Sequence, residues 1–69
     1  MSSFGENLKN ERNIAGLSQG EFAKRLGTTQ QRISEWERNK VEPTLSNIVA
    51  IIKVLDISFE ELIQDIKND

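Results

Sequence analysis

The stretch Gln19–Arg38, QGEFAKRLGTTQQRISEWER, decides the fold of this chain. It predicts two short helices joined by a tight turn at Leu26–Thr28, because the glycine in this turn favours the left-handed conformation that commonly ends a helix. Thr29 is a suitable N-cap for the second helix. That helix then starts with two adjacent amide side chains, Gln30 and Gln31, which are unusual in a helix that serves only the core.

One helix is predicted before this stretch. Phe4, Leu8, Arg12 and Ala15 recur at helical spacing along one face. Gly16 follows them, and glycine adopts a left-handed helix end more easily than any other residue. We therefore expect a helix over about residues 4–15.

Two more helices are predicted after it. Thr44 is a candidate N-cap, and the helix that follows has a stripe of apolar residues at Leu45, Ile48, Val49, Ile52 and Leu55, with a second apolar edge at Ile51 and Val54. Ser58–Glu61 is a capping box, and the helix that it opens offers Phe59, Leu62, Ile63 and Ile66. No segment alternates with a period of two residues. The predicted fold class is therefore all-α, a compact five-helix domain.

The composition narrows the possible classes of function. The 69 residues contain no histidine and no cysteine, which removes the commonest catalytic and metal-ligating side chains. The acidic residues show no calcium-loop spacing and the four glycines form no phosphate loop, so we expect no enzyme, no cofactor and no metal site. The length predicts a single domain, 1–69. Because the chain shows neither a membrane-length apolar run nor a signal-peptide pattern, we expect a cytoplasmic protein.

Charge is distributed unevenly along the chain. The net charge is −2, but residues 1–41 carry seven basic and five acidic side chains, while residues 42–69 carry two basic and six acidic ones. A basic half and an acidic half are expected where one face meets a polyanion. Scatter over a solvated surface would give a similar asymmetry, so charge alone leaves both interpretations open.

The residue types within Gln19–Arg38 favour a helix-turn-helix, in which two helices cross closely and the second enters a DNA groove. Such a motif needs a small residue where the helices meet, a glycine at the turn and apolar residues in the angle. Ala23, Gly27, Ile33 and Trp36 supply these at suitable positions. An ordinary helical hairpin is the alternative, and it would share the glycine but need neither the small Ala23 nor the amide pair.

Residues 4–66 resemble the Cro/CI-type helix-turn-helix family of phage repressors and their bacterial relatives, also called the Xre family. The resemblance lies in SQGEFAKRLGTTQQRISEWERNK and in the later segments PTL and IIKVLDISFEEL. The run Gly27–Gln31 is particularly similar to the start of the recognition helix in lambdoid phage repressors. The resemblance implies a sequence-specific transcriptional regulator, most simply a repressor, with a helix-turn-helix unit at residues 19–38 and its third helix in the major groove.

The resemblance implies that the first turn of the third helix reads base edges. Gln30 and Gln31 would be the main readers, and a glutamine amide matches the N6/N7 edge of adenine. Further along the helix, Arg32 would reach guanine or a phosphate, and Glu35 would accept from a cytosine amino group or repel a phosphate. Solvation of the helix start is the alternative role of the two glutamines.

Phosphate contacts are expected on both sides of this helix. Gln19 stands at the start of the preceding helix, where free backbone N–H groups attract anions, and its family counterpart holds a phosphate. Thr29, Asn39 and Lys40 are further candidates. Such contacts fix the register and supply affinity, but they carry no sequence information.

The resemblance also implies an ion pair between the first and third helices. Arg12 interrupts the apolar face of the first helix, and the resembling repressors pair its position with that of Glu37. We therefore expect a partly buried Arg12–Glu37 pair. The sequence departs from the family at Gly20, where alanine is usual, at Asn39, where glycine is common, and in its acidic overall charge.

A single helix reads only a few base pairs, so we expect a homodimer on a near-palindromic double-stranded operator. The candidate contacts are apolar residues in excess on the last two helices, namely Ile51, Val54, Phe59, Ile63 and Ile66. The alternative is that these residues belong to the core.

Three other functions stay open at this level. The same fold serves antitoxins, which bind a toxin protein, and controllers of restriction–modification systems. A pure interaction module is the third, and its groove-facing residues would be incidental. Such a module would show no salt-dependent binding to DNA.

Overall fold

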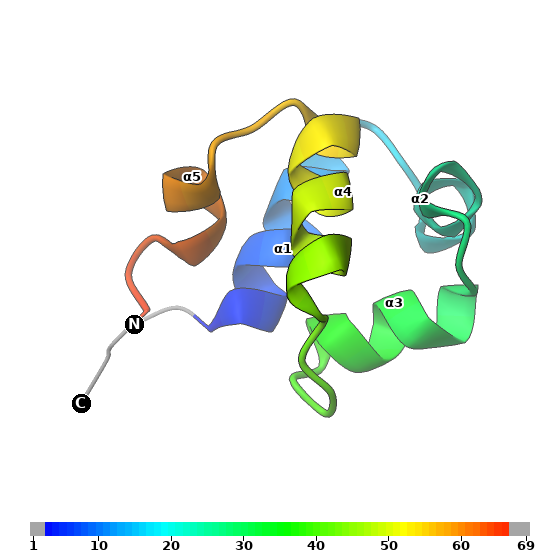
Figure 1. The fold of residues 1–69 in the computed structure, drawn as a ribbon, viewed down its shortest axis with the longest axis horizontal. Coiled ribbons are helices and arrows are strands. Elements are labelled where there is room, and N and C mark those ends of the chain that lie inside the picture. Colours follow the sequence, from blue (N-terminus) through cyan, green and yellow to red (C-terminus); the bar gives the residue numbers. More distant parts are fainter. Residues whose placement is uncertain (1–2, 67–69) are drawn as a thin grey trace.

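The computed structural model describes residues 3–66, which form five helices and no strand (Figure 1). The helices are α1 (Phe4–Ile14), α2 (Gln19–Leu26), α3 (Gln30–Glu37), α4 (Leu45–Leu55) and α5 (Phe59–Ile63). Within that range no helix has the length and apolar character that crossing a membrane requires. The predicted all-α class is confirmed.

Local capping explains where the helices begin and end. The N-cap hydroxyls of all five helices accept a backbone N–H from three residues further on; they belong to Ser3, Ser18, Thr29, Thr44 and Ser58. Gly16 and Gly27 take the left-handed conformation expected of them, with φ of 76° and 71°. The capping box of α2 also lowers the pKa of the Glu21 carboxyl, first because the Ser18 backbone N–H donates to it and then through the Ser18 hydroxyl. The boundaries of the helix-turn-helix therefore follow from short-range hydrogen bonds.

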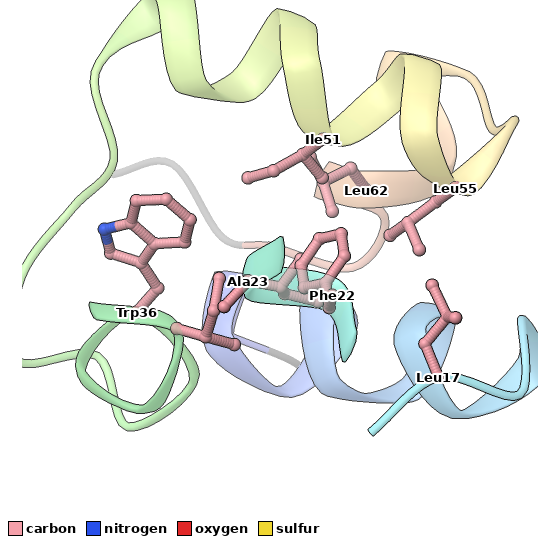
Figure 2. Close-up of a cluster of buried hydrophobic side chains, with 9 residues drawn as sticks. Leu17, Phe22, Ala23, Trp36, Ile51, Leu55 and Leu62 are labelled. Atoms are coloured by element: carbon pink, nitrogen blue, oxygen red, sulfur yellow. The ribbon is translucent and has the colours of Figure 1, made fainter. Parts of the chain in front are cut away.

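A small core lies where α1, α2, α3 and α4 meet, and α5 closes it (Figure 2). Trp36 and Phe22 are its largest fully buried side chains. The buried apolar residues are Leu8, Leu17, Phe22, Ala23, Ile33, Trp36, Ile51, Leu55 and Leu62. Four of these nine residues come from α2 and α3, so the same side chains stabilise the domain and set the angle between those two helices.

The predicted inner faces are wrong in two places. Ala15 lies just beyond the end of α1 and is exposed. In α4, Leu45 and Val49 are 75% and 45% exposed, whereas Ile51 is fully buried. Apolar residues extend around more of α4 than the rest of the domain can cover. The part of the helix that packs against the core is centred on Ile51 and Leu55.

The short helix α5 is attached to α1 by a residue that the sequence analysis missed. The buried Asn7 side chain donates from Nδ2 to the backbone oxygens of Leu62 and Gln64, both at 2.9 Å. These bonds satisfy carbonyls that the end of a helix leaves without partners. Because α5 ends at Ile63, Ile66 lies outside the helix, which corrects the prediction that Ile66 belongs to its apolar face.

Candidate nucleic-acid interface

The turn between α2 and α3 has the geometry that a helix-turn-helix requires. Gly27 caps α2 in the left-handed conformation, and the N–H of Thr28 donates to the Ala23 carbonyl at 2.9 Å. Ala23 is 3% exposed. Ile33 and Trp36 fill the angle between α2 and α3 and are 0% and 1% exposed. The helices meet through a small side chain and an apolar wedge, as the sequence predicts.

The first turn of α3 projects away from this core. Thr29 caps the helix by accepting from the N–H of Arg32 at 3.2 Å. Gln30, Gln31 and Arg32 are all exposed, while Glu35 is partly buried. The outer face of α3 therefore presents two amides and one guanidinium, and Ile33 and Trp36 anchor its inner face.

Arg12 and Glu37 form the expected ion pair. Arg12 Nε lies 2.6 Å from Glu37 Oε2, and Arg12 Nη2 donates to Glu37 Oε1 at 3.1 Å. Arg12 Nη1 also donates to the Leu17 carbonyl at 2.8 Å. The two side chains are only 8% and 3% exposed, so this bidentate pair is more deeply buried than the expected, partly buried pair. It joins α1, the α1–α2 connection and the end of α3.

Gln19 belongs to the same network, and the sequence analysis did not foresee this. Its Nε2 donates to Glu37 Oε1 at 3.0 Å, which fixes the side chain at the N-terminus of α2. An amide nitrogen carries two N–H groups, so one remains for another acceptor. The network thus orients Gln19 in a way compatible with its expected phosphate contact, which stays a prediction.

The end of α3 is fastened to the start of α1 by Asn39. This residue has a φ of 59°, in the left-handed region that asparagine adopts more readily than most residues. Its Oδ1 accepts from the N–H of Gly5 and its Nδ2 donates to Ser3 Oγ, both at 2.9 Å. Asn39 therefore has a structural role that the sequence analysis missed, and its phosphate contact stays a prediction, as does that of the exposed Lys40.

Gly5 allows α1 to approach α3 closely. A Cβ built on Gly5 would overlap the Glu37 carbonyl oxygen and would lie 2.8 Å from the Trp36 carbonyl oxygen. Both obstacles are backbone atoms of α3, which cannot turn aside as a flexible side chain can. The position of α3 against α1 is therefore possible only because residue 5 has no side chain.

The charge asymmetry of the sequence is also present in space. The molecule is 34 Å long, and α5 lies at the opposite end from α2 (Figure 1). Lys24, Arg25 and Arg32 are exposed on α2 and α3, together with the acidic Glu21, whereas α5 carries Glu60 and Glu61. The α5 end is therefore acidic, while charges of both signs are mixed on α2 and α3, so charge alone still leaves both interpretations open.

The candidate dimer residues fall into three groups. Ile51 is fully buried, so its prediction as a contact is wrong: packing places it at the centre of the core. Val54 is partly buried and packs against that core. Phe59 is 45% exposed, and Ile63 and Ile66 are 37% exposed, so these three are accessible to a partner.

The chain matches the family model described as helix-turn-helix over residues 8–62. It is 36% identical over 61 residues to YonR, an uncharacterized HTH-type transcriptional regulator derived from the SPbeta prophage of Bacillus subtilis, and this match covers 88% of the chain and 56% of YonR. It is 32% identical over 60 residues to repressor protein C2 of Salmonella phage P22, covering 87% of the chain and 28% of C2. The chain thus spans about half of the first relative and less of the second.

Two solved structures share the fold. The P22 c2 repressor in complex with a synthetic operator superimposes with a TM-score of 0.85 at 30% identity, over 93% of this chain and 97% of that one. The restriction-modification controller protein C.AhdI from Aeromonas hydrophila superimposes with a TM-score of 0.81 at 34% identity, over 86% of each chain. The resemblance to lambdoid repressors is therefore confirmed, and the chain belongs to the helix-turn-helix family.

Proposed function

We propose that this chain binds a specific sequence in double-stranded DNA and regulates transcription, most simply as a repressor. The observation that carries the proposal is the exposed first turn of α3, presented by a recognition helix that is held from behind by the core and by the Arg12–Glu37 pair. The P22 c2 repressor, whose solved structure includes an operator, has the same fold. The protein acts by binding rather than by catalysis, in the cytoplasm where its DNA lies.

The side chains of α3 suggest which bases are read. Gln30 and Gln31 each present an amide, which donates to N7 and accepts from N6 of adenine in the major groove. Arg32 is exposed on the same turn and suits guanine or a phosphate. Glu35 is partly buried, and it is the least accessible of the four proposed readers.

The proposed phosphate contacts surround these readers. Gln19 and Thr29 stand at the N-termini of α2 and α3, and Asn39 and Lys40 follow the end of α3. Lys40 is the charged member of this set and is exposed. Charge neutralisation by such a lysine raises affinity for every DNA sequence alike.

Two substitutions separate reading from phosphate binding. Gln30→Ala should relax the preference at one position of the selected DNA motif, with a loss of about 1–3 kcal/mol on the preferred base. Lys40→Ala should weaken all sites about equally and reduce the salt slope of log K by roughly one. Selection of bound sites from random duplex DNA, followed by titrations at several salt concentrations, measures both effects. A uniform loss from Gln30→Ala would mean that another residue is the reader.

We also propose that the protein binds a near-palindromic operator as a homodimer. Phe59, Ile63 and Ile66 are the exposed candidates, and Val54 is a partly buried one. The unexpected exposure of Leu45 and Val49 adds a second apolar strip on α4. Exposed apolar side chains gathered on one small domain are typical of an association surface.

Sedimentation velocity tests this interface. The parent chain should show a concentration-dependent dimer, and Phe59→Glu/Ile63→Glu should weaken the dimer at least about tenfold, because it places two charges in an apolar contact. Ile14→Glu is the matched control, since Ile14 is 71% exposed at the end of α1. A chain that stays monomeric even on its selected DNA would refute the dimer.

One alternative within DNA-binding regulation is favoured by a specific observation. C.AhdI, a restriction-modification controller, matches this chain at 34% identity over 86% of each chain. The role of a controller would require a methyltransferase gene beside the gene for this chain. If no methyltransferase gene lies beside it, the controller role is excluded and the repressor role is the one that we propose.

A further inference from the structure

Gly20 is a glycine that the domain itself does not need. It is the second residue of α2 and its φ lies outside the left-handed region, so an L side chain can adopt its backbone conformation. A Cβ built at this position meets only two neighbours, at 3.6 and 3.9 Å, which are ordinary van der Waals distances. Alanine would fit there and would favour the helix more than glycine does. Neither the backbone nor packing therefore explains the glycine.

The nearest neighbour of that absent Cβ is the proposed reader Gln30. The 3.6 Å distance is to Gln30 Oε1, across the angle between α2 and α3, and the 3.9 Å distance is to Ser18 Oγ. Position 20 thus forms the surface beneath the Gln30 amide. With a methyl group at position 20 the amide would rest against it, and with glycine that side is open.

We propose that Gly20 determines specificity by leaving the Gln30 amide unsupported, so that the protein discriminates only weakly between adenine and guanine at the base pair that Gln30 reads. This inference rests on the proposed function. Adenine offers an acceptor at N7 and a donor at N6, whereas guanine offers acceptors at N7 and O6. An amide that is free to rotate can bind the adenine edge with its oxygen and one N–H group. It can also bind the guanine edge with its two N–H groups. An amide confined to one orientation satisfies only one of these edges.

The test compares adenine with guanine at two base pairs of the operator selected by the parent chain. The base pair of Gln30 is the one whose preference Gln30→Ala relaxes, and Gln31→Ala identifies the second in the same way. Affinities for the operator and its adenine-to-guanine variants are measured for the parent chain, Gly20→Ala, Gln30→Ala and the Gly20→Ala/Gln30→Ala double variant. Thermal melting confirms that each variant is folded.

Gly20→Ala should shift the preference between adenine and guanine at the base pair of Gln30 by roughly two- to tenfold, the range expected from restricting one mobile side chain. The preference at the base pair of Gln31 should not change, and the shift should vanish in the Gln30→Ala background. The inference would be overturned by an unchanged preference, by an equal shift at both base pairs, or by a shift that survives Gln30→Ala. A Gln30→Ala variant that relaxes no base pair would overturn it as well. A parent chain that selects no motif from random DNA would instead overturn the proposed function, and this inference with it.

Discussion

Removing either partner of the Arg12–Glu37 pair is expected to lower the free energy of unfolding by about 3–5 kcal/mol, because it leaves a buried charge without its counterion. In Arg12→Met, the Glu37 carboxylate keeps the Gln19 amide as a partner. In Glu37→Leu, the Arg12 guanidinium keeps the Leu17 carbonyl. The total free energy of unfolding of a domain of this size is only about 3–10 kcal/mol. Each single variant should therefore be close to unfolding.

The double variant Arg12→Met/Glu37→Leu should recover most of that loss, because neither charge remains. It should stay about 1–3 kcal/mol less stable than the parent chain, since the Leu17 carbonyl loses its Arg12 donor. Urea denaturation of all four proteins gives the coupling energy of the pair. If the double variant and both single variants melted alike, the pair would contribute nothing specific.

Replacing Gly5 with alanine is expected to destabilise the domain by about 2–3 kcal/mol, because the added methyl group collides with backbone rather than with a movable side chain. For a domain of this length the melting temperature should fall by roughly 10–20 °C. Circular dichroism during heating measures the change. The displacement of α1 from α3 should also lengthen the bond between the Gly5 N–H and Asn39 Oδ1.

Gly20→Ala is the matched control for this prediction, since it makes the same chemical change in another helix, where the added Cβ would meet only side-chain atoms at van der Waals distance. It should stabilise the domain by roughly 0.5–1 kcal/mol through helix propensity alone. Opposite signs for the two variants would separate the steric effect at Gly5 from the propensity effect. A Gly5→Ala variant that melts with the parent chain would show that α1 can shift without loss.

The parts of the fold that could be predicted from sequence are those with short-range causes. Ser18 and Thr29 signal helix starts through hydrogen bonds to residues three positions away. Gly27 signals a turn through its own backbone preference. Ala23 and Trp36 are informative because the close crossing of two neighbouring helices restricts size at fixed positions. Each of these signals is contained within the helix-turn-helix itself.

The parts that could not be predicted depend on how distant segments meet. The periodicity of α4 predicts an apolar arc but not which part of it faces inward. The sequence places Leu45 in the main stripe and Ile51 on a second apolar edge, whereas in the structure Leu45 is exposed and Ile51 is buried. The roles of Gly5 and Asn39 depend on a contact between positions 34 residues apart. The Arg12–Glu37 pair was available only through the family resemblance, since neither residue signals the other along the chain.

The attachment of α1 has a consequence for the order in which the chain folds. Contacts between α2 and α3 close over short loops, as in the bond from Thr28 to Ala23. The bonds that tie α1 to α3 span 25 to 36 positions, and those from Asn7 to the end of α5 span 55 and 57. Closing a longer loop carries a larger entropic cost, which must be met before its contacts can form. We therefore expect the α2–α3 unit to form early in the folding transition, and the joining of the two ends of the chain through Asn7 to be its last step.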